Sequence, residues 1–106
     1  MTSGGDAGPI ACSLDAVSLG ERADEWRALV ASSVTSLQSE DTAVRLVLRE
    51  SEAALTAAAA LAQREKQCCP FFDVSVVLEA DRRTLVMAVP DGAEEVLAAF
   101  VALLSA

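Results

Sequence analysis

The chain has 106 residues, of which 53% are hydrophobic and 23% charged, so it can form one globular domain and is too apolar to be disordered throughout. Its net charge of −8, with no cluster of lysine or arginine, argues against binding a nucleic acid or an anionic membrane surface. It contains no histidine, which excludes Ser-His-Asp catalysis, Cys-His catalysis and histidine-ligated metal centres within one chain.

The N-terminus and the cysteine count point to a cytoplasmic protein. Residues 1–9 lack the basic and apolar regions of a secretory signal, and the longest apolar run, residues 53–62, is mostly alanine and too short to span a bilayer. Three cysteines in such a protein are expected to be reduced, and an odd number argues against a complete disulfide framework. A domain this small has a thin stability margin, which makes a homodimer a candidate assembly.

The first fourteen residues fall into two parts. Residues 1–8 are small, polar and glycine-rich and predict a loose tail, which leaves residues 9–106 as a single domain. Residues 9–14 alternate weakly between apolar and polar side chains, a pattern that predicts a short strand. Cys12 lies on the apolar face of that strand.

A long helix is predicted next. Ser18 and Glu21 have the spacing of a capping box, and apolar side chains recur at helical spacing as far as Val34 or Leu37. Trp26 lies on this apolar stripe, so we expect a core position from which its indole N–H reaches the surface.

The middle of the chain predicts a strand followed by a second helix. Val44, Leu46 and Leu48 alternate with Arg45, Val47 and Arg49, as in a half-buried strand. Ser51 can cap a helix that has Glu52 near the positive end of its dipole and that runs to about Gln67. Pro70 cannot continue this helix and disfavours helical backbone at the residue before it, so the helix ends at two adjacent cysteines.

Two strands and a helix complete the chain. Alternation over residues 72–79 and 84–89 predicts two strands joined by a turn, which pair as an antiparallel hairpin. Asp91 and Glu94 have capping-box spacing and open a final helix.

The predicted order is therefore β-α-β-α-β-β-α, an α+β fold. The two strand-helix-strand passages favour right-handed crossovers between parallel strands, so we expect a mixed four-stranded sheet. The strands are patterned on one side, which places the helices mainly on one face of the sheet.

The adjacent Cys68 and Cys69 are the leading candidates for a functional site. Glu65 precedes them by three and four residues, so helical spacing places its carboxylate on the same surface as both thiols. Two thiolates suit a linear site for a soft ion, and a third from Cys12 suits a trigonal one, whereas zinc would also need Glu65, a water or a second subunit. We predict a soft metal ion, Cu(I), Hg(II) or Zn(II), with Cys68, Cys69, Cys12 and Glu65 as ligands.

Other roles for the cysteines stay open. A disulfide between neighbours strains the peptide between them, and covalent catalysis would have to use Glu65 as its base. The negative end of a helix favours a bound cation over a thiolate, which ranks metal binding above redox chemistry and makes an enzyme the less favoured interpretation. The cysteines can also simply pack, in which case the protein is a non-catalytic interaction or dimerisation module that uses an exposed sheet face or Phe71.

The sequence also carries a recognisable pattern in its second half. The string E-x-x-C-C-P-F-F at residues 65–72, a hairpin and V-P-x-G-A at residues 89–93 resemble small, largely uncharacterised bacterial proteins and segments attached to some mercury-resistance-type regulators. The resemblance implies a link to heavy metals, with Glu65, Cys68 and Cys69 as the site. The chain has no recognisable DNA-binding helix pair, so the resemblance does not imply a regulator role for it alone.

Overall fold

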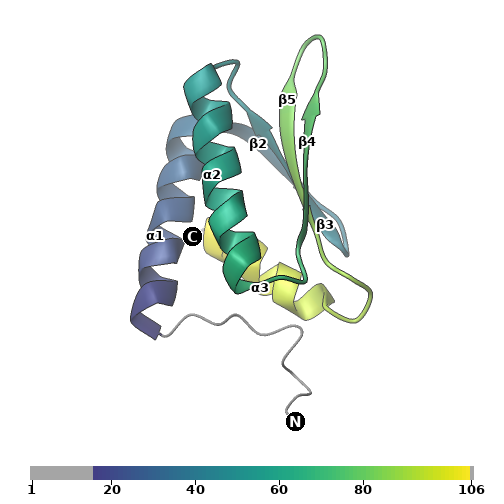
Figure 1. The fold of residues 1–106 in the computed structure, drawn as a ribbon. Helices are drawn as coiled ribbons and strands as arrows, with labels where there is room; N and C mark the ends of the chain where they lie inside the picture. The colour runs from purple at the N-terminus through teal and green to yellow at the C-terminus, as the bar shows by residue number, and fades with distance from the viewer. Residues whose placement is uncertain (1–15, 106) are drawn as a thin grey trace.

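The computed structural model of the protein describes residues 16–105 (Figure 1). Its elements, in chain order, are α1 (Ala16–Ser33), β2 (Val34–Ser39), β3 (Ala43–Leu48), α2 (Glu52–Cys68), β4 (Asp73–Leu78), β5 (Arg83–Ala88) and α3 (Glu94–Leu104). The tail predicted for residues 1–8 and the strand predicted for residues 9–14, with Cys12, lie outside the described residues.

The four strands form one sheet in the order β2-β3-β5-β4. Figure 1 shows the three helices on one side of this sheet, so the α+β class and the one-sided helical cover are confirmed. The prediction of a mixed sheet is wrong for the described residues, because all three of their strand pairings are antiparallel. The β3-α2-β4 passage does join two strands that point the same way, but β5 lies between them and pairs with both.

The strand that the sequence reasoning missed is β2. The first helix was expected to reach Val34 or Leu37, but α1 ends at Ser33 and the next six residues form β2. Arg49 holds this helix end, since its backbone N–H donates to the carbonyl of Ser33 at 2.8 Å and its Nε donates to the carbonyl of Ser32 at 2.8 Å. β2 pairs with β3, and this long-range pairing outweighs the helical spacing of the apolar residues.

The core lies between the sheet and the helices. Alternate residues of β3 and β5 are fully enclosed on the helix side: Val44, Leu46, Leu48, Leu85 and Met87. The strand residues between them are half-buried on the other side of the sheet, which no helix of the described chain covers (Figure 1).

The α2 helix brings the candidate site into the core. Ser51 caps it as predicted, because its hydroxyl accepts the backbone N–H of Ala54 at 3.2 Å. One stripe of α2 is buried along its whole length: Ala54, Ala58, Leu61, Ala62, Glu65 and Cys68. The small alanines of this stripe let neighbouring elements approach closely, and Glu65 therefore enters the core on an otherwise apolar stripe.

The α3 helix begins later than its capping signal predicts. Asp91 does not cap it; the N-cap is Ala93, which makes no side-chain cap, and Glu94 instead accepts the backbone N–H of Gly92 at 3.0 Å. The reason is a turn before the helix, in which the N–H of Ala93 donates to the carbonyl of Pro90 and Gly92 has a φ of 97° that suits glycine. Among the helices of residues 16–105, none is both long and apolar enough to cross a membrane.

Candidate metal site

Three of the four predicted ligands meet at the C-terminal end of α2. Glu65, Cys68 and Cys69 are all buried, and each offers one donor atom within 4.8 Å of the others. The two Sγ atoms are 3.5 Å apart, and Oε2 of Glu65 lies 3.7 Å from Sγ of Cys68 and 3.5 Å from Sγ of Cys69. We call these three residues the triad. The fourth predicted ligand, Cys12, lies outside the described residues.

Local backbone geometry builds the triad, as the sequence predicted. The helix stays regular to Cys68, and the N–H of Cys69 still donates to the carbonyl of Glu65 at 2.8 Å. Residues three and four positions after Glu65 therefore share its face of the helix. The chain then turns at Pro70, where the N–H of Phe72 donates to the carbonyl of Cys69 at 3.2 Å. The two thiols are not joined by a disulfide, and both can donate to the Glu65 carboxylate.

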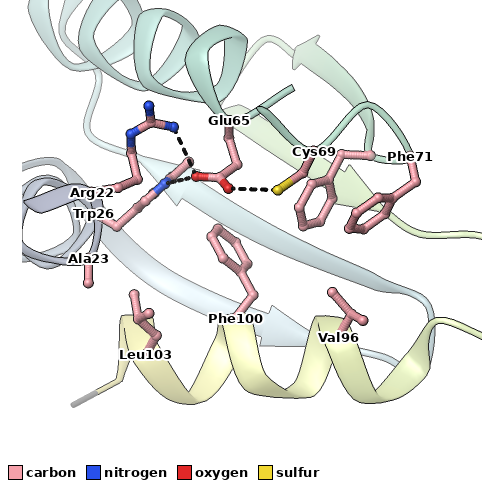
Figure 2. Close-up of a pocket in the computed structure, with 10 residues that line it drawn as sticks. Arg22, Ala23, Trp26, Glu65, Cys69, Phe71, Val96, Phe100 and Leu103 are labelled. Carbon is pink, nitrogen blue, oxygen red and sulfur yellow. Dashed lines mark hydrogen bonds and ion pairs between the residues drawn. The ribbon is translucent and has the colours of Figure 1, made fainter. Parts of the chain in front are cut away.

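The other oxygen of Glu65 is held by α1. The indole N–H of Trp26 donates to Oε1 at 2.9 Å, and Nη1 of Arg22 lies 3.4 Å from the same atom (Figure 2). Trp26 is in the core as expected, but its N–H does not reach the surface, because Glu65 supplies an acceptor inside the protein. The carboxylate thus has one oxygen on α1 and the other on the thiols, which orients it toward both sulfurs.

Arg22 is the site residue that sequence reasoning missed. Its side chain is only 15% exposed, and its Nη1 lies 3.4 Å from Glu65 and 3.9 Å from Sγ of Cys68. The signal in the sequence was the spacing of Arg22 and Trp26, four residues apart, which places two N–H donors on one face of α1. That these donors meet Glu65 depends on how α1 packs against α2.

The charges of the site balance in two states. With both thiols protonated, the Glu65 carboxylate and the Arg22 guanidinium form a neutral pair. With both thiols deprotonated, the triad carries three negative charges, of which Arg22 offsets one and a divalent cation would offset the other two. Buried charge is costly unless it is compensated, so a deprotonated triad needs positive charge beyond that of Arg22. The carbonyls at the end of α2 add partial negative charge that also favours a cation.

The donor spacing suits bent rather than linear coordination. With metal–sulfur bonds of about 2.3 Å, a linear ion would hold its two sulfurs about 4.6 Å apart and a tetrahedral ion about 3.8 Å apart. The Sγ atoms are 3.5 Å apart, close to the tetrahedral value. A sulfur and an oxygen on a tetrahedral ion are separated by about 3.6 Å, and the triad shows 3.5 and 3.7 Å. In a linear two-thiolate arrangement the two sulfurs would have to lie farther apart than the 3.5 Å seen here.

A partly open cavity of about 140 Å³ adjoins the triad. Glu65 and Cys69 lie at one side of it, and Figure 2 shows the carboxylate and the Cys69 sulfur facing the ring of Phe100. Most of the lining is apolar, with four aromatic and several aliphatic side chains: Trp26, Phe71, Phe72, Phe100, Val96 and Leu103. The rings contact one another at centroid distances of 5.0 to 5.5 Å. Phe71 thus lines the same cavity as Cys69.

The arrangement can coordinate an ion or react as a dithiol. It combines two soft sulfur donors with one harder oxygen donor, a set that thiophilic ions accept.

Comparisons of the chain with models of protein families, with curated proteins and with solved structures give no match.

Proposed function

We propose that the protein binds a soft metal ion, Zn(II) or Hg(II) ahead of Cu(I), through Cys68, Cys69 and Glu65. The observation that carries the proposal is the triad itself: three buried donor atoms within 4.8 Å, with separations close to those on a tetrahedral ion. The preference for a divalent ion follows from the single positive charge of Arg22 beside three acidic groups. The heavy-metal link that the E-x-x-C-C-P-F-F pattern implies supports the same three residues.

The triad supplies three protein ligands, one fewer than a structural zinc site. Structural zinc sites are closed by four protein ligands, whereas three protein ligands leave a position for an exchangeable group. We place the protein in the cytoplasm, where its thiols would stay reduced, with Cys12 as the candidate for an additional ligand. We favour a binding or carrier role over an enzyme, because the negative end of α2 favours a bound cation over a reactive thiolate.

The test is a metal titration of the reduced protein in the absence of oxygen. The wild type is titrated with Zn(II), Hg(II) and Cu(I) against competing chelators, beside the Cys68→Ser/Cys69→Ser variant, while Cys12→Ser tests whether Cys12 is an additional ligand. We expect one tight site in the wild type and a loss of affinity of more than about 100-fold in the double variant, because both sulfur donors are gone. Equal binding by the wild type and the double variant would contradict the proposal, provided that circular dichroism shows both to be folded.

An alternative function, dimerisation, is supported by the exposed edge of the sheet. β4 is an edge strand, and Val76, Val77 and Leu78 on it are 41%, 41% and 65% exposed. These three side chains are uncharged and apolar, and they lie between the exposed acidic residues Asp73 and Glu79. An unprotected apolar edge pairs readily with another strand. We therefore propose that a homodimer, if the protein forms one, pairs β4 with β4 of a second copy.

A charge on this edge is expected to abolish such a dimer. Val77→Lys adds a positive charge beside its two-fold partner, and the wild-type dimer should become a monomer in size-exclusion chromatography with light scattering. Ser36→Lys, on the opposite edge strand β2, is the matched control and should leave the dimer intact. A wild type that stays monomeric at high concentration would rule out the dimer.

A further inference from the structure

We infer that the two thiols of the triad also bind a trivalent arsenical that carries one small organic group, and that the apolar cavity receives this group. The inference rests on the proposed function, because it uses the same two sulfur atoms. It goes beyond that function in naming the chemical class of the ligand and in assigning a role to the aromatic cavity.

The size and lining of the cavity point to a small ring. A dry apolar cavity of about 150 Å³ in another protein holds one benzene molecule, and the cavity here measures about 140 Å³. Phe72 and Phe100 are 5.5 Å apart and Trp26 and Phe100 are 5.1 Å apart, in tilted and edge-on arrangements that leave ring faces and edges for a further aromatic group. A bare ion at the triad would leave this apolar surface unused.

The geometry of the triad points to arsenic(III) rather than to a linear organometal. Arsenic(III) is pyramidal and binds two sulfurs and one carbon at angles close to or slightly above a right angle, which suits Sγ atoms that are 3.5 Å apart. An organomercury cation is linear and would use one of the two sulfurs. Cys69 and Glu65 both line the cavity (Figure 2), so an arsenic atom bound to the sulfur of Cys69 lies beside this space, and we place its organic group there.

The reaction balances without an oxidant or a reductant. An organoarsonous acid, R–As(OH)₂, reacts with the two thiols to form R–As(S–Cys)₂ and two water molecules. Two S–H and two As–O bonds break, two As–S bonds form, and arsenic stays trivalent. Glu65 is placed to carry the protons, since both thiols lie within 3.7 Å of its Oε2, and each proton leaves on a departing hydroxide. The product is neutral, so the Glu65–Arg22 pair keeps its own balance of charge.

The experiment compares phenylarsonous acid, methylarsonous acid and inorganic arsenite on the reduced full-length protein. Intact-mass spectrometry reports the adduct, and the fluorescence of Trp26, the single tryptophan, reports binding in competition with a small dithiol. The affinity of each arsenical for the small dithiol is measured without the protein, which corrects for differences in the intrinsic reactivity of the arsenicals toward thiols. After this correction we expect the phenyl compound to bind at least about tenfold tighter than the methyl compound, because the ring is buried.

Two matched substitutions on α3 test the role of the cavity. Val96→Phe fills the cavity and should remove the preference for the phenyl compound, whereas Val101→Phe makes the same change outside the cavity lining and should keep it. The inference is overturned if the wild type shows no corrected preference for the phenyl compound over the methyl compound. It is also overturned if Val96→Phe and Val101→Phe lose this preference equally. In both cases metal binding by the triad still stands. An adduct that persists in Cys68→Ser/Cys69→Ser also overturns the inference. If the wild type binds none of the metal ions and none of the arsenicals, the proposed function fails as well.

Discussion

Replacing Glu65 by alanine is expected to lower the free energy of unfolding of the metal-free protein by about 2 to 4 kcal/mol. The substitution leaves the buried indole N–H of Trp26 without its acceptor and leaves Arg22 beside an empty space. Breaking a fully enclosed ion pair costs about 3 to 5 kcal/mol. The cost is smaller here, because Arg22 is 15% exposed and keeps Glu25 as a partner at 3.6 Å.

Replacing Glu65 by glutamine separates the structural role from the binding role. The amide oxygen of glutamine can still accept the N–H of Trp26, so most of the stability should remain. The negative charge is lost, however, and metal affinity should fall by about 10- to 100-fold, as when other groups that support a metal site are removed. Glu65→Ala should therefore lower both the stability and the metal affinity, whereas Glu65→Gln should lower mainly the metal affinity.

Urea denaturation and metal titration of the same preparations check this prediction. Gln63→Ala is the matched control, since Gln63 is exposed on the same helix and its loss should change neither property. If Glu65→Gln binds metal as tightly as the wild type, Glu65 is not a ligand and the triad is reduced to its two thiols. If Glu65→Ala is as stable as the wild type, the bridge from Trp26 to Glu65 is not what holds α1 against the end of α2.

Replacing Phe72 by alanine is expected to destabilise the protein by about 3 to 5 kcal/mol. The ring is 2% exposed and lies between Phe71 and Phe100, at centroid distances of 5.0 and 5.5 Å. Phe72 packs between the segment that follows α2 and the helix α3, so its loss opens a cavity between them. Small domains have a total stability of about 5 to 15 kcal/mol, so this loss is a large fraction of it.

Phe71 provides the internal comparison for Phe72. It is the neighbouring residue with the same side chain, but it is only half-buried at the rim of the cavity, so Phe71→Ala should cost no more than about 1.5 kcal/mol. Urea midpoints at equal slope give both values. Similar losses for the two variants would contradict the placement of Phe72 alone in the core.

The triad is the part of the site that local sequence could predict. Ser51 and Pro70 define where α2 begins and must end, and the helical repeat then places Glu65 on the same face as Cys68 and Cys69. These relations span at most a few turns of one helix, and the structure confirms each of them. The same holds for the β4–β5 hairpin, whose strands are neighbours in sequence.

The predictions from sequence that were wrong concern regions whose structure depends on contacts between distant segments of the chain. Val34 and Leu37 continue a helical stripe, but pairing with β3 and the capping of α1 by Arg49 turn them into β2. Trp26 was correctly placed in the core, yet its hydrogen-bond partner lies 39 residues further along the chain. A local pattern contains no information about such a partner.

The sequence by itself therefore determined the α+β class, the end of α2 and the grouping of two thiols with one carboxylate, because these follow from the short-range geometry of a single backbone element. Only the tertiary structure decided that the sheet of the described residues is antiparallel, that Arg22 and Trp26 orient the carboxylate, and that α3 lines an aromatic cavity beside the sulfurs. Those features arise from packing between elements far apart in the chain, where burial and hydrogen bonding across the core outweigh local preference.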